Sequence, residues 1–311
     1  MKKIALLGLA TILLLASCQE IRIENHEDWG KIFEENGVQG SFEYFDNNKE
    51  RVHYYNKDHN STPQNAGASY QFLASLIALE TATAPTEQYT IPWDKQYRSY
   101  VNGEAVIITD TTLPGYKPEW NQDLTMTQAF QYNAVPYFQQ LNLRMDTAEI
   151  QHYLDTVKFG NQKLGADVAN FWQDGTLKIS PDEQVGFMKR LYHEQLKGFS
   201  PRSQRMTKGF MDKYQDPKNE ITTYYKKYTT QQNDTTFVTY IGYIEKISNL
   251  INVNTKLNDA IPHPYFFCLN VFTTDKNKNK NIEAIGQKVF EEIIAEAELN
   301  KPFFDEEKAK K

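Results

Sequence analysis

Hydrophobic and polar residues alternate with a period of two near the start of the chain, in VQGSFEYFDNNKERVHYYNKD. Apolar or aromatic side chains at Phe42 and Tyr44, and again at Val52 and Tyr54, flank a polar turn at residues 46–48. Alternation on both sides of a short polar turn is typical of two antiparallel strands. The pattern therefore predicts a β-hairpin over residues 38–56.

A helix-rich stretch follows, from roughly residue 67 to residue 215. It opens with GASYQFLASLIALE, residues 67–80, which has the apolar density of a buried helix. A second helix start stands at Ser180, where Pro181 suits the first helical position and Glu183 can complete a capping box. We expect these helices to form one subdomain.

Strand-like segments return from roughly residue 219 to residue 275, as TTFVTYIGYIEK and PYFFCLNVF. A polar run, DKNKNKN, then predicts a turn before a C-terminal helix over residues 281–300. That helix carries its apolar residues on one face, spaced for packing on a sheet: Ile282, Ile285, Val289, Phe290, Ile293 and Ile294. Strands at both ends and helices between them predict an α+β fold, with an antiparallel sheet, flanking terminal helices and an inserted helical subdomain.

Composition narrows the class of protein. The chain has 311 residues, a net charge of −6 and 13% aromatic residues, enough apolar material for one large domain, which we place at residues 29–311. The mild acidity excludes the clustered basic surface of a nucleic-acid-binding protein, and the aromatic content excludes a wholly disordered chain.

The first residues read as a targeting signal. Two lysines precede a short apolar run that ends in Leu15-Ala16-Ser17-Cys18, which resembles a bacterial lipobox. The resemblance implies a signal peptide over residues 1–17, lipidation of Cys18 and a lipidated tether over residues 18–28. The protein would then be anchored to a membrane of the bacterial cell envelope. The alternative is an ordinary secretory signal with a chance cysteine.

Cysteine and histidine usage argues against a metal site or a disulfide. Apart from Cys18, only Cys268 is present, inside an apolar strand pattern that predicts a small core residue. The six histidines show no zinc-type spacing. We expect no metal and no cofactor.

Six segments in order resemble one enzyme family. These are GASYQFLASLIALE, IPWDKQYR, WNQDLTMTQAFQYNAVPYF, Phe159-Gly160-Asn161, FWQDGTLKISPDEQVGFMKRLY with FSPRSQRMTKGFM, and YIGYIEK with YFFCLNVF. Between Trp29 and Ile294 the chain is similar to the class D β-lactamases, within the penicillin-recognising serine enzymes. The resemblance implies the fold of that family and acyl transfer to a serine as its ancestral chemistry.

The catalytic positions implied by this resemblance carry other residues. The nucleophilic serine falls on Ala68, and the lysine base one turn later falls on Gln71, which is neither basic nor able to carry a carbamate. The relay serine falls on Asn133. The nearest candidate for the lysine of the K-T-G strand is Lys227, without the glycine, and the tryptophan that protects the base is retained as Trp172.

The substitutions indicate an inactive envelope lipoprotein that acts as a binding or interaction module, with Asn133, Trp172 and Lys227 as candidate ligand contacts. Its partner would be a peptidoglycan peptide, a β-lactam-like ligand or another protein. The alternative is a divergent serine β-lactamase or peptidoglycan peptidase that uses Ser69, or a serine such as Ser75. Ser69 would lack a base, because Phe72 stands one turn later. A sensor acylated by β-lactam is a third hypothesis, which also needs the missing serine.

Overall fold

The computed structural model describes residues 22–95, 97–101, 104–108, 117–216, 218, 220–232, 235–251, 258–273 and 281–303. The expected signal peptide, Cys18 and most of the polar run at residues 275–281 lie outside these ranges. Within them, no helix combines the length and apolar character needed to cross a membrane.

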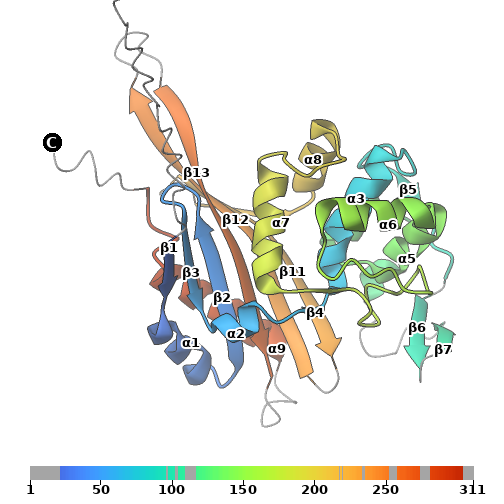
Figure 1. The fold of residues 1–311 in the computed structure, drawn as a ribbon, viewed down its shortest axis with the longest axis horizontal. Coiled ribbons are helices and arrows are strands. Elements are labelled where there is room, and N and C mark those ends of the chain that lie inside the picture. The colour runs from blue at the N-terminus through green and yellow to red at the C-terminus, as the bar shows by residue number, and fades with distance from the viewer. Residues whose placement is uncertain are drawn as a thin grey trace, which may run out of the picture.

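A seven-stranded sheet forms the centre of the molecule, in the order β1-β3-β2-β13-β12-β11-β10 (Figure 1). Neighbouring strands are antiparallel except β1 and β3, which are parallel. The pairing of β2 with β3 confirms the predicted hairpin, and β12 and β13 confirm the two late strands. The strands are β1 (Arg22–Asn25), β2 (Gln39–Asp46), β3 (Arg51–Tyr55), β10 (Asp212–Asp216), β11 (Ile221–Gln232), β12 (Thr235–Ile251) and β13 (Asn258–Phe272).

The sheet has an edge strand on each side that the sequence pattern does not predict. Residues 22–25, expected in a polar tether, form β1, and residues 212–216, expected at the end of the helical region, form β10. Most β1 and β10 side chains are exposed or half-buried. An edge strand of this kind has no apolar face to mark it in the sequence.

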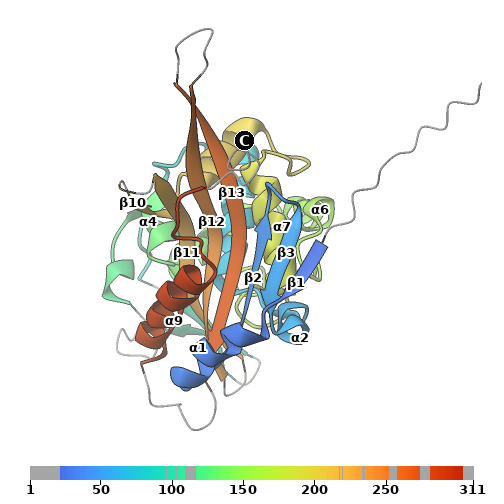
Figure 2. The same ribbon diagram turned by 90° about the vertical axis from the view of Figure 1, so that its left-hand side faces the viewer.

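Two helices cover one face of the sheet, α1 (Gly30–Glu35) and α9 (Ile282–Glu296). Figure 2 shows both lying against the strands. The buried residues there include Phe33, Val289 and Ile293, so the predicted apolar face of the last helix packs on the sheet. The terminal helices therefore flank the sheet, as the α+β prediction requires.

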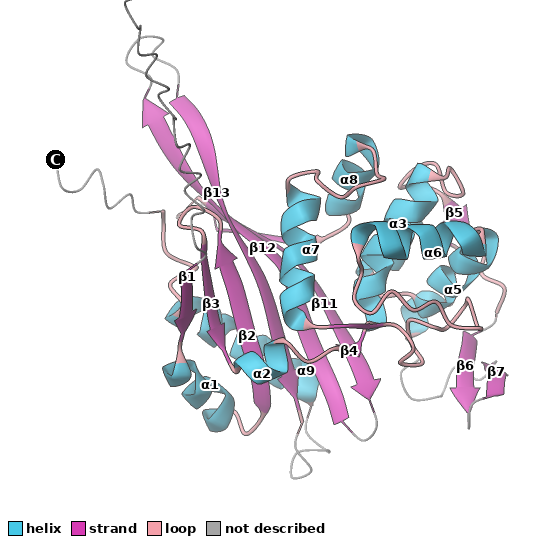
Figure 3. Cartoon of the chain, in the orientation of Figure 1, coloured by secondary structure: helices cyan, strands magenta, loops and turns pink. Residues whose placement is uncertain are grey.

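The other face carries α7 (Pro181–Tyr192) and the helical subdomain beyond it (Figure 3). The capping box predicted at Ser180 is present, with Ser180 and Glu183 bonding each other's backbone N–H. Cys268 is a free, buried thiol in this core, as expected.

The subdomain helices are α3 (Tyr70–Glu80), α4 (Met126–Gln131), α5 (Val135–Arg144), α6 (Thr147–Val157) and α8 (Pro201–Lys208). The remaining elements are η1 (Glu27–Trp29), α2 (Lys57–Asn60), β4 (Gln64–Asn65), η2 (Gly67–Ser69), β5 (Thr90–Ile91), β6 (Tyr97–Val101), β7 (Glu104–Ile108), η3 (Pro118–Trp120), β8 (Leu124–Thr125) and β9 (Lys178–Ile179).

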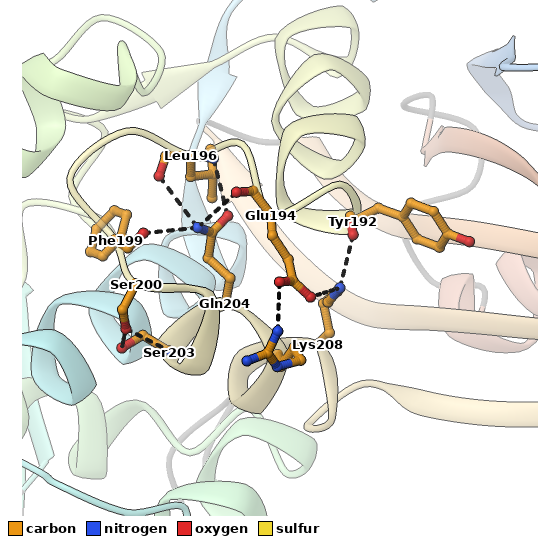
Figure 4. A network of polar contacts seen from close by, with 9 residues as sticks. Tyr192, Glu194, Leu196, Phe199, Ser200, Ser203, Gln204 and Lys208 are labelled. Carbon is orange, nitrogen blue, oxygen red and sulfur yellow. Dashed lines mark hydrogen bonds and ion pairs between the residues drawn. The ribbon is translucent and has the colours of Figure 1, made fainter.

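A polar network fixes α8 against its neighbours (Figure 4). The Gln204 side chain is buried; it accepts a hydrogen bond from Leu196 N–H and donates one to the Phe199 carbonyl, both at 3.0 Å. Ser203 donates its hydroxyl to the Glu80 carboxylate at 2.6 Å. The C-terminal end of α3 is thereby tied to α8, which holds α3 in place at the end remote from its first residues.

Candidate functional site

The candidate site begins at the short turn η2, which leads into α3. Gly67 has a φ of +49°, a region that glycine occupies without cost. A Cβ added there would lie 2.0 Å from the Thr230 Cγ2 atom of β11. The start of α3 therefore packs directly against β11, and Gly67 is required for that approach.

A loop from the helical subdomain covers the same turn. The Gly67 N–H donates to the Trp172 carbonyl at 2.9 Å, and the Asn65 side chain donates to the Gln173 carbonyl at 2.7 Å. The Trp172 ring is fully buried against Tyr70, and its indole N–H donates to the Ala169 carbonyl at 2.8 Å. In this arrangement Trp172 is a core residue that supports the site rather than an exposed contact for a ligand.

Ala68 and Ser69 occupy the last two positions of η2, immediately before α3. Both are buried, with exposed fractions of 5% and 2%. The Ser69 hydroxyl donates to the Ala66 carbonyl at 2.6 Å and also interacts with the phenol of Tyr228. Burial raises the pKa of Tyr228 above its ordinary value, so this phenol remains protonated and cannot serve as a base. Ser69 is thus held by a backbone carbonyl, and among the described residues neither of these two partners is a base that would activate it.

Gln71 lies one turn further along α3 and is fully buried. Neither atom of its side-chain amide has a hydrogen-bond partner among the described residues, and the same holds for the Ser75 hydroxyl. Residues four apart on a helix share a face, so these two groups form a polar stripe below Ala68. A buried amide without partners is costly, which makes Gln71 an unusual choice for packing alone.

Replacing Gln71 by methionine is expected to stabilise the fold. Methionine has a similar length and no polar group to desolvate, so the free energy of unfolding should rise by about 1–3 kcal/mol. Urea unfolding of the two proteins measures the difference. The matched control is Gln139→Met, because Gln139 is also fully buried but donates to Asn170 at 2.6 Å. That control should lose stability, and a loss of similar size in Gln71→Met would contradict the expectation.

Strand β11 lies against the turn before α3. Its side chains alternate between the two faces of the sheet, which decides which of them face α3. Thr229 bonds Glu283 of α9, whereas Thr230 lies over Gly67. Successive side chains of a strand point to opposite faces, so Lys227 shares the α9 face with Thr229. The resemblance assigns the K-T-G lysine to Lys227, whereas the lysine on the α3 side of the strand is the residue before it, Lys226.

Lys226 is 2% exposed, although it lies in a lysine-rich stretch that resembles an exposed strand. Its ammonium donates to the Phe130 carbonyl at 2.6 Å and lies 3.7 Å from the centre of the Phe130 ring. Burial lowers the pKa of Lys226 well below its usual value, while Asp212 acts in the opposite direction. The strand period identifies this residue only once the structure places Thr230 over Gly67.

Asn133 connects the helical subdomain to the same strand. Its backbone has a φ of +52°, a conformation that asparagine tolerates better than most residues. The side-chain amide donates to the Lys227 carbonyl at 2.9 Å, and its oxygen is buried with no hydrogen-bond partner in the part of the chain that the structure describes. Lys227 therefore enters the site through its backbone, and its half-buried side chain points elsewhere.

Taken together, the site brings Ala68, Gln71, Asn133 and Lys226 to the junction of α3, the loop before α5 and β11. Gln71 and Lys226 are buried, and the Lys226 ammonium and the Asn133 amide already donate to backbone carbonyls. Among the described residues, the Ser69 hydroxyl at the start of α3 has no basic hydrogen-bond partner. At the two positions on α3 and η2 that the resemblance assigns to the nucleophile and the base, the described residues are therefore Ala68 and Gln71, which do not form a nucleophile–base pair.

Comparison with protein families gives one matching model, the penicillin binding protein transpeptidase domain, over residues 45–249. Among curated proteins, the chain is 28% identical over 192 residues to the regulatory protein BlaR1 of Bacillus licheniformis, covering 60% of this chain and 29% of BlaR1. It is 27% identical over 188 residues to β-lactamase OXA-48 of Klebsiella pneumoniae, covering 60% of this chain and 64% of that enzyme. The chain thus matches less than two thirds of the length of either relative.

Solved structures show the same fold. A class D β-lactamase from Sebaldella termitidis superposes with a TM-score of 0.72 at 22% identity, covering 89% of this chain and 98% of that one. The C-terminal domain of the Bacillus licheniformis BlaR penicillin-receptor superposes with a TM-score of 0.70 at 21% identity, covering 89% and 96%. The similarity includes an enzyme and a receptor domain, so it leaves the activity to be argued from the site.

Proposed function

Because the chain belongs to the family of penicillin binding protein transpeptidase domains, we propose that it is a β-lactamase-like recognition domain that has lost acyl transfer. The observation that supports the proposal is the start of α3. Ala68 offers no atom to acylate, and the residue one turn later, Gln71, is an amide that cannot accept a proton at neutral pH. The surrounding core, including Trp172 and Phe171, is closely packed.

The competing function is a divergent serine hydrolase that uses Ser69. Its hydroxyl is bonded to the Ala66 carbonyl, and its neighbour Tyr228 is a protonated phenol. Ser75 is fully buried in the middle of α3, away from the helix start. The geometry supports neither serine as a nucleophile as well as it supports a non-catalytic site.

The ligand we propose is a peptidoglycan peptide or a β-lactam-like molecule. BlaR, whose C-terminal domain has this fold, is a penicillin-receptor by name, which supports a binding role for such a domain. We further propose that Cys18 carries a lipid anchor that retains the protein at a membrane of the cell envelope. A protein partner is the other candidate ligand.

The test is to expose the full chain to a fluorescent penicillin. We expect no added mass by intact-protein mass spectrometry, hydrolysis of the penicillin at the rate of the buffer blank, and a rise of the melting temperature at saturating ligand. The Ser69→Ala variant should behave identically. An adduct, or turnover, that the unaltered chain shows and Ser69→Ala loses would instead establish the hydrolase.

A further inference from the structure

Two imidazoles and one carboxylate meet at the edge of the sheet, far along the strand order from the site on β11. Strand β1 runs parallel to β3, and Glu24 is the direct cross-strand partner of His53. His26 follows Glu24 by two residues, at the end of β1. Figure 2 shows β1 beside β3 at this edge. A parallel pairing thus brings together three metal-ligand types that are distant in the sequence.

The three side chains approach at distances suited to a shared cation. The His26 Nε2 and His53 Nδ1 atoms are 3.0 Å apart, and the His53 Nδ1 atom is 3.3 Å from the Glu24 Oε2 atom. One ligand atom of each residue lies within 4.8 Å of the others. Bonds of about 2.0–2.2 Å at tetrahedral angles separate ligand atoms by roughly 3.3–3.6 Å, so small side-chain adjustments suffice.

Aromatic packing fixes the orientation of both imidazoles. Trp29 stacks on His26 at 4.1 Å between ring centres with planes 5° apart, and Tyr44 stacks on His53 at 4.5 Å and 9°. A ligand set whose rings are already held in place loses less entropy when it binds an ion. This support is independent of any metal.

Arg51 fixes the carboxylate in the same way. Its guanidinium donates to the Glu24 Oε1 atom at 2.7 Å, and the second oxygen, Oε2, faces His53. A ligating carboxylate is commonly oriented by such an outer hydrogen bond. The Glu24 side chain is 38% exposed and the His53 side chain 12% exposed, so an ion can reach the group from solvent.

We propose that Glu24, His26 and His53 form a binding site for a divalent transition-metal ion of the Zn²⁺ class. Two imidazole nitrogens and one carboxylate oxygen are donors that Zn²⁺ accepts, and three protein ligands leave a fourth position for water. Oxygen-preferring ions such as Mg²⁺ and Ca²⁺ are disfavoured by the two nitrogens. This inference replaces the expectation from histidine spacing that the chain has no metal site.

The ion would tie β1 to β3. The structure describes four register pairs between the two strands, and most of the described β1 side chains are exposed, so this edge has little apolar burial to hold it. A ligand set that spans both strands adds a cross-link at that place. Metal binding is then coupled to the stability of the sheet edge.

The experiment is calorimetric titration of Zn²⁺ into the full chain, purified without a histidine tag and stripped with a chelator. We expect one ion per chain with a dissociation constant in the micromolar range or below, and a higher melting temperature with excess Zn²⁺. The variants Glu24→Gln and His53→Gln should each weaken binding at least about tenfold. His152→Gln, on helix α6, serves as the control and should bind as the unaltered chain does.

Co²⁺ provides a second readout, because its visible absorption reports the ligand geometry. An intense absorption band that is lost in Glu24→Gln would support a four-coordinate site at these residues. Absence of saturable Zn²⁺ binding, or affinity unchanged in both Glu24→Gln and His53→Gln, would overturn the proposal. Since Glu24 lies on an exposed edge strand, its variant remains informative even if His53→Gln fails to fold.

Discussion

An Ala68→Ser/Gln71→Lys variant is expected to react with a fluorescent penicillin at least about 100-fold faster than the unaltered chain. Positions 68 and 71 are three apart at the start of α3, so the new hydroxyl and amine would share a face. The Gln71 position is fully buried, and burial lowers the pKa of a lysine toward the range in which it acts as a base. In-gel fluorescence and intact-protein mass measure the rate and the adduct.

A second double variant separates the base from the nucleophile. Ala68→Ser/Gln71→Met has the same hydroxyl and a side chain of similar size at position 71, but no amine, so it should label at the background rate. If the lysine variant folds and stays unlabelled, the surface around Ala68 no longer admits a penicillin. Tyr228, buried beside Ser69 on the adjacent strand, would then be the first residue to replace by glycine.

Much of the fold is predictable from the sequence because its elements bury distinct faces. The hairpin of β2 and β3 alternates, α9 has one apolar face, and Ser180 begins α7 with a capping box. The edge strands β1 and β10 escape prediction, since strands that bury little look polar. Their pairing depends on partners distant in the chain, which no local pattern specifies.

Part of the candidate site can likewise be predicted from the sequence, and part of it cannot. The losses at Ala68 and Gln71 are visible from spacing on one helix, because residues three apart always share a face. The resemblance points to Lys227, whereas Lys226 lies on the α3 side of β11. The two adjacent lysines fall on opposite faces of the strand, and without the glycine of the K-T-G motif the sequence does not decide between them. The cluster of Glu24, His26 and His53 could not be predicted at all, because a parallel pairing between remote segments creates it.

The second large effect that we expect is a change in the pH dependence of stability, and it comes from Glu43. Glu43 lies on β2 and is 5% exposed. Its cross-strand neighbour in the register of β2 and β13 is Cys268. Burial, together with the charge of Asp182 and a hydrogen bond to it, raises the pKa of Glu43 from 4.5 to about 9. The folded protein therefore keeps this proton at neutral pH, whereas the unfolded chain releases it above about pH 4.5. The unfolded state binds fewer protons in that interval, so this group lowers the stability as pH rises.

Replacing Glu43 by glutamine should remove that dependence, because the amide resembles the protonated acid and can still donate to Asp182. Between pH 5 and pH 8 the gain in the free energy of unfolding over the unaltered chain should grow by about 2–4 kcal/mol, following a slope of at most ~1.4 kcal/mol per pH unit. Urea unfolding across this range gives the difference directly, and other titrating groups cancel because both proteins carry them. Glu35→Gln, an exposed residue of α1, is the control and should show a constant difference near zero. If the difference in unfolding free energy between Glu43→Gln and the unaltered chain is equally independent of pH, Glu43 is already ionised in the folded protein. Solvent or a charged neighbour would then reach this part of the interface between α7 and the sheet.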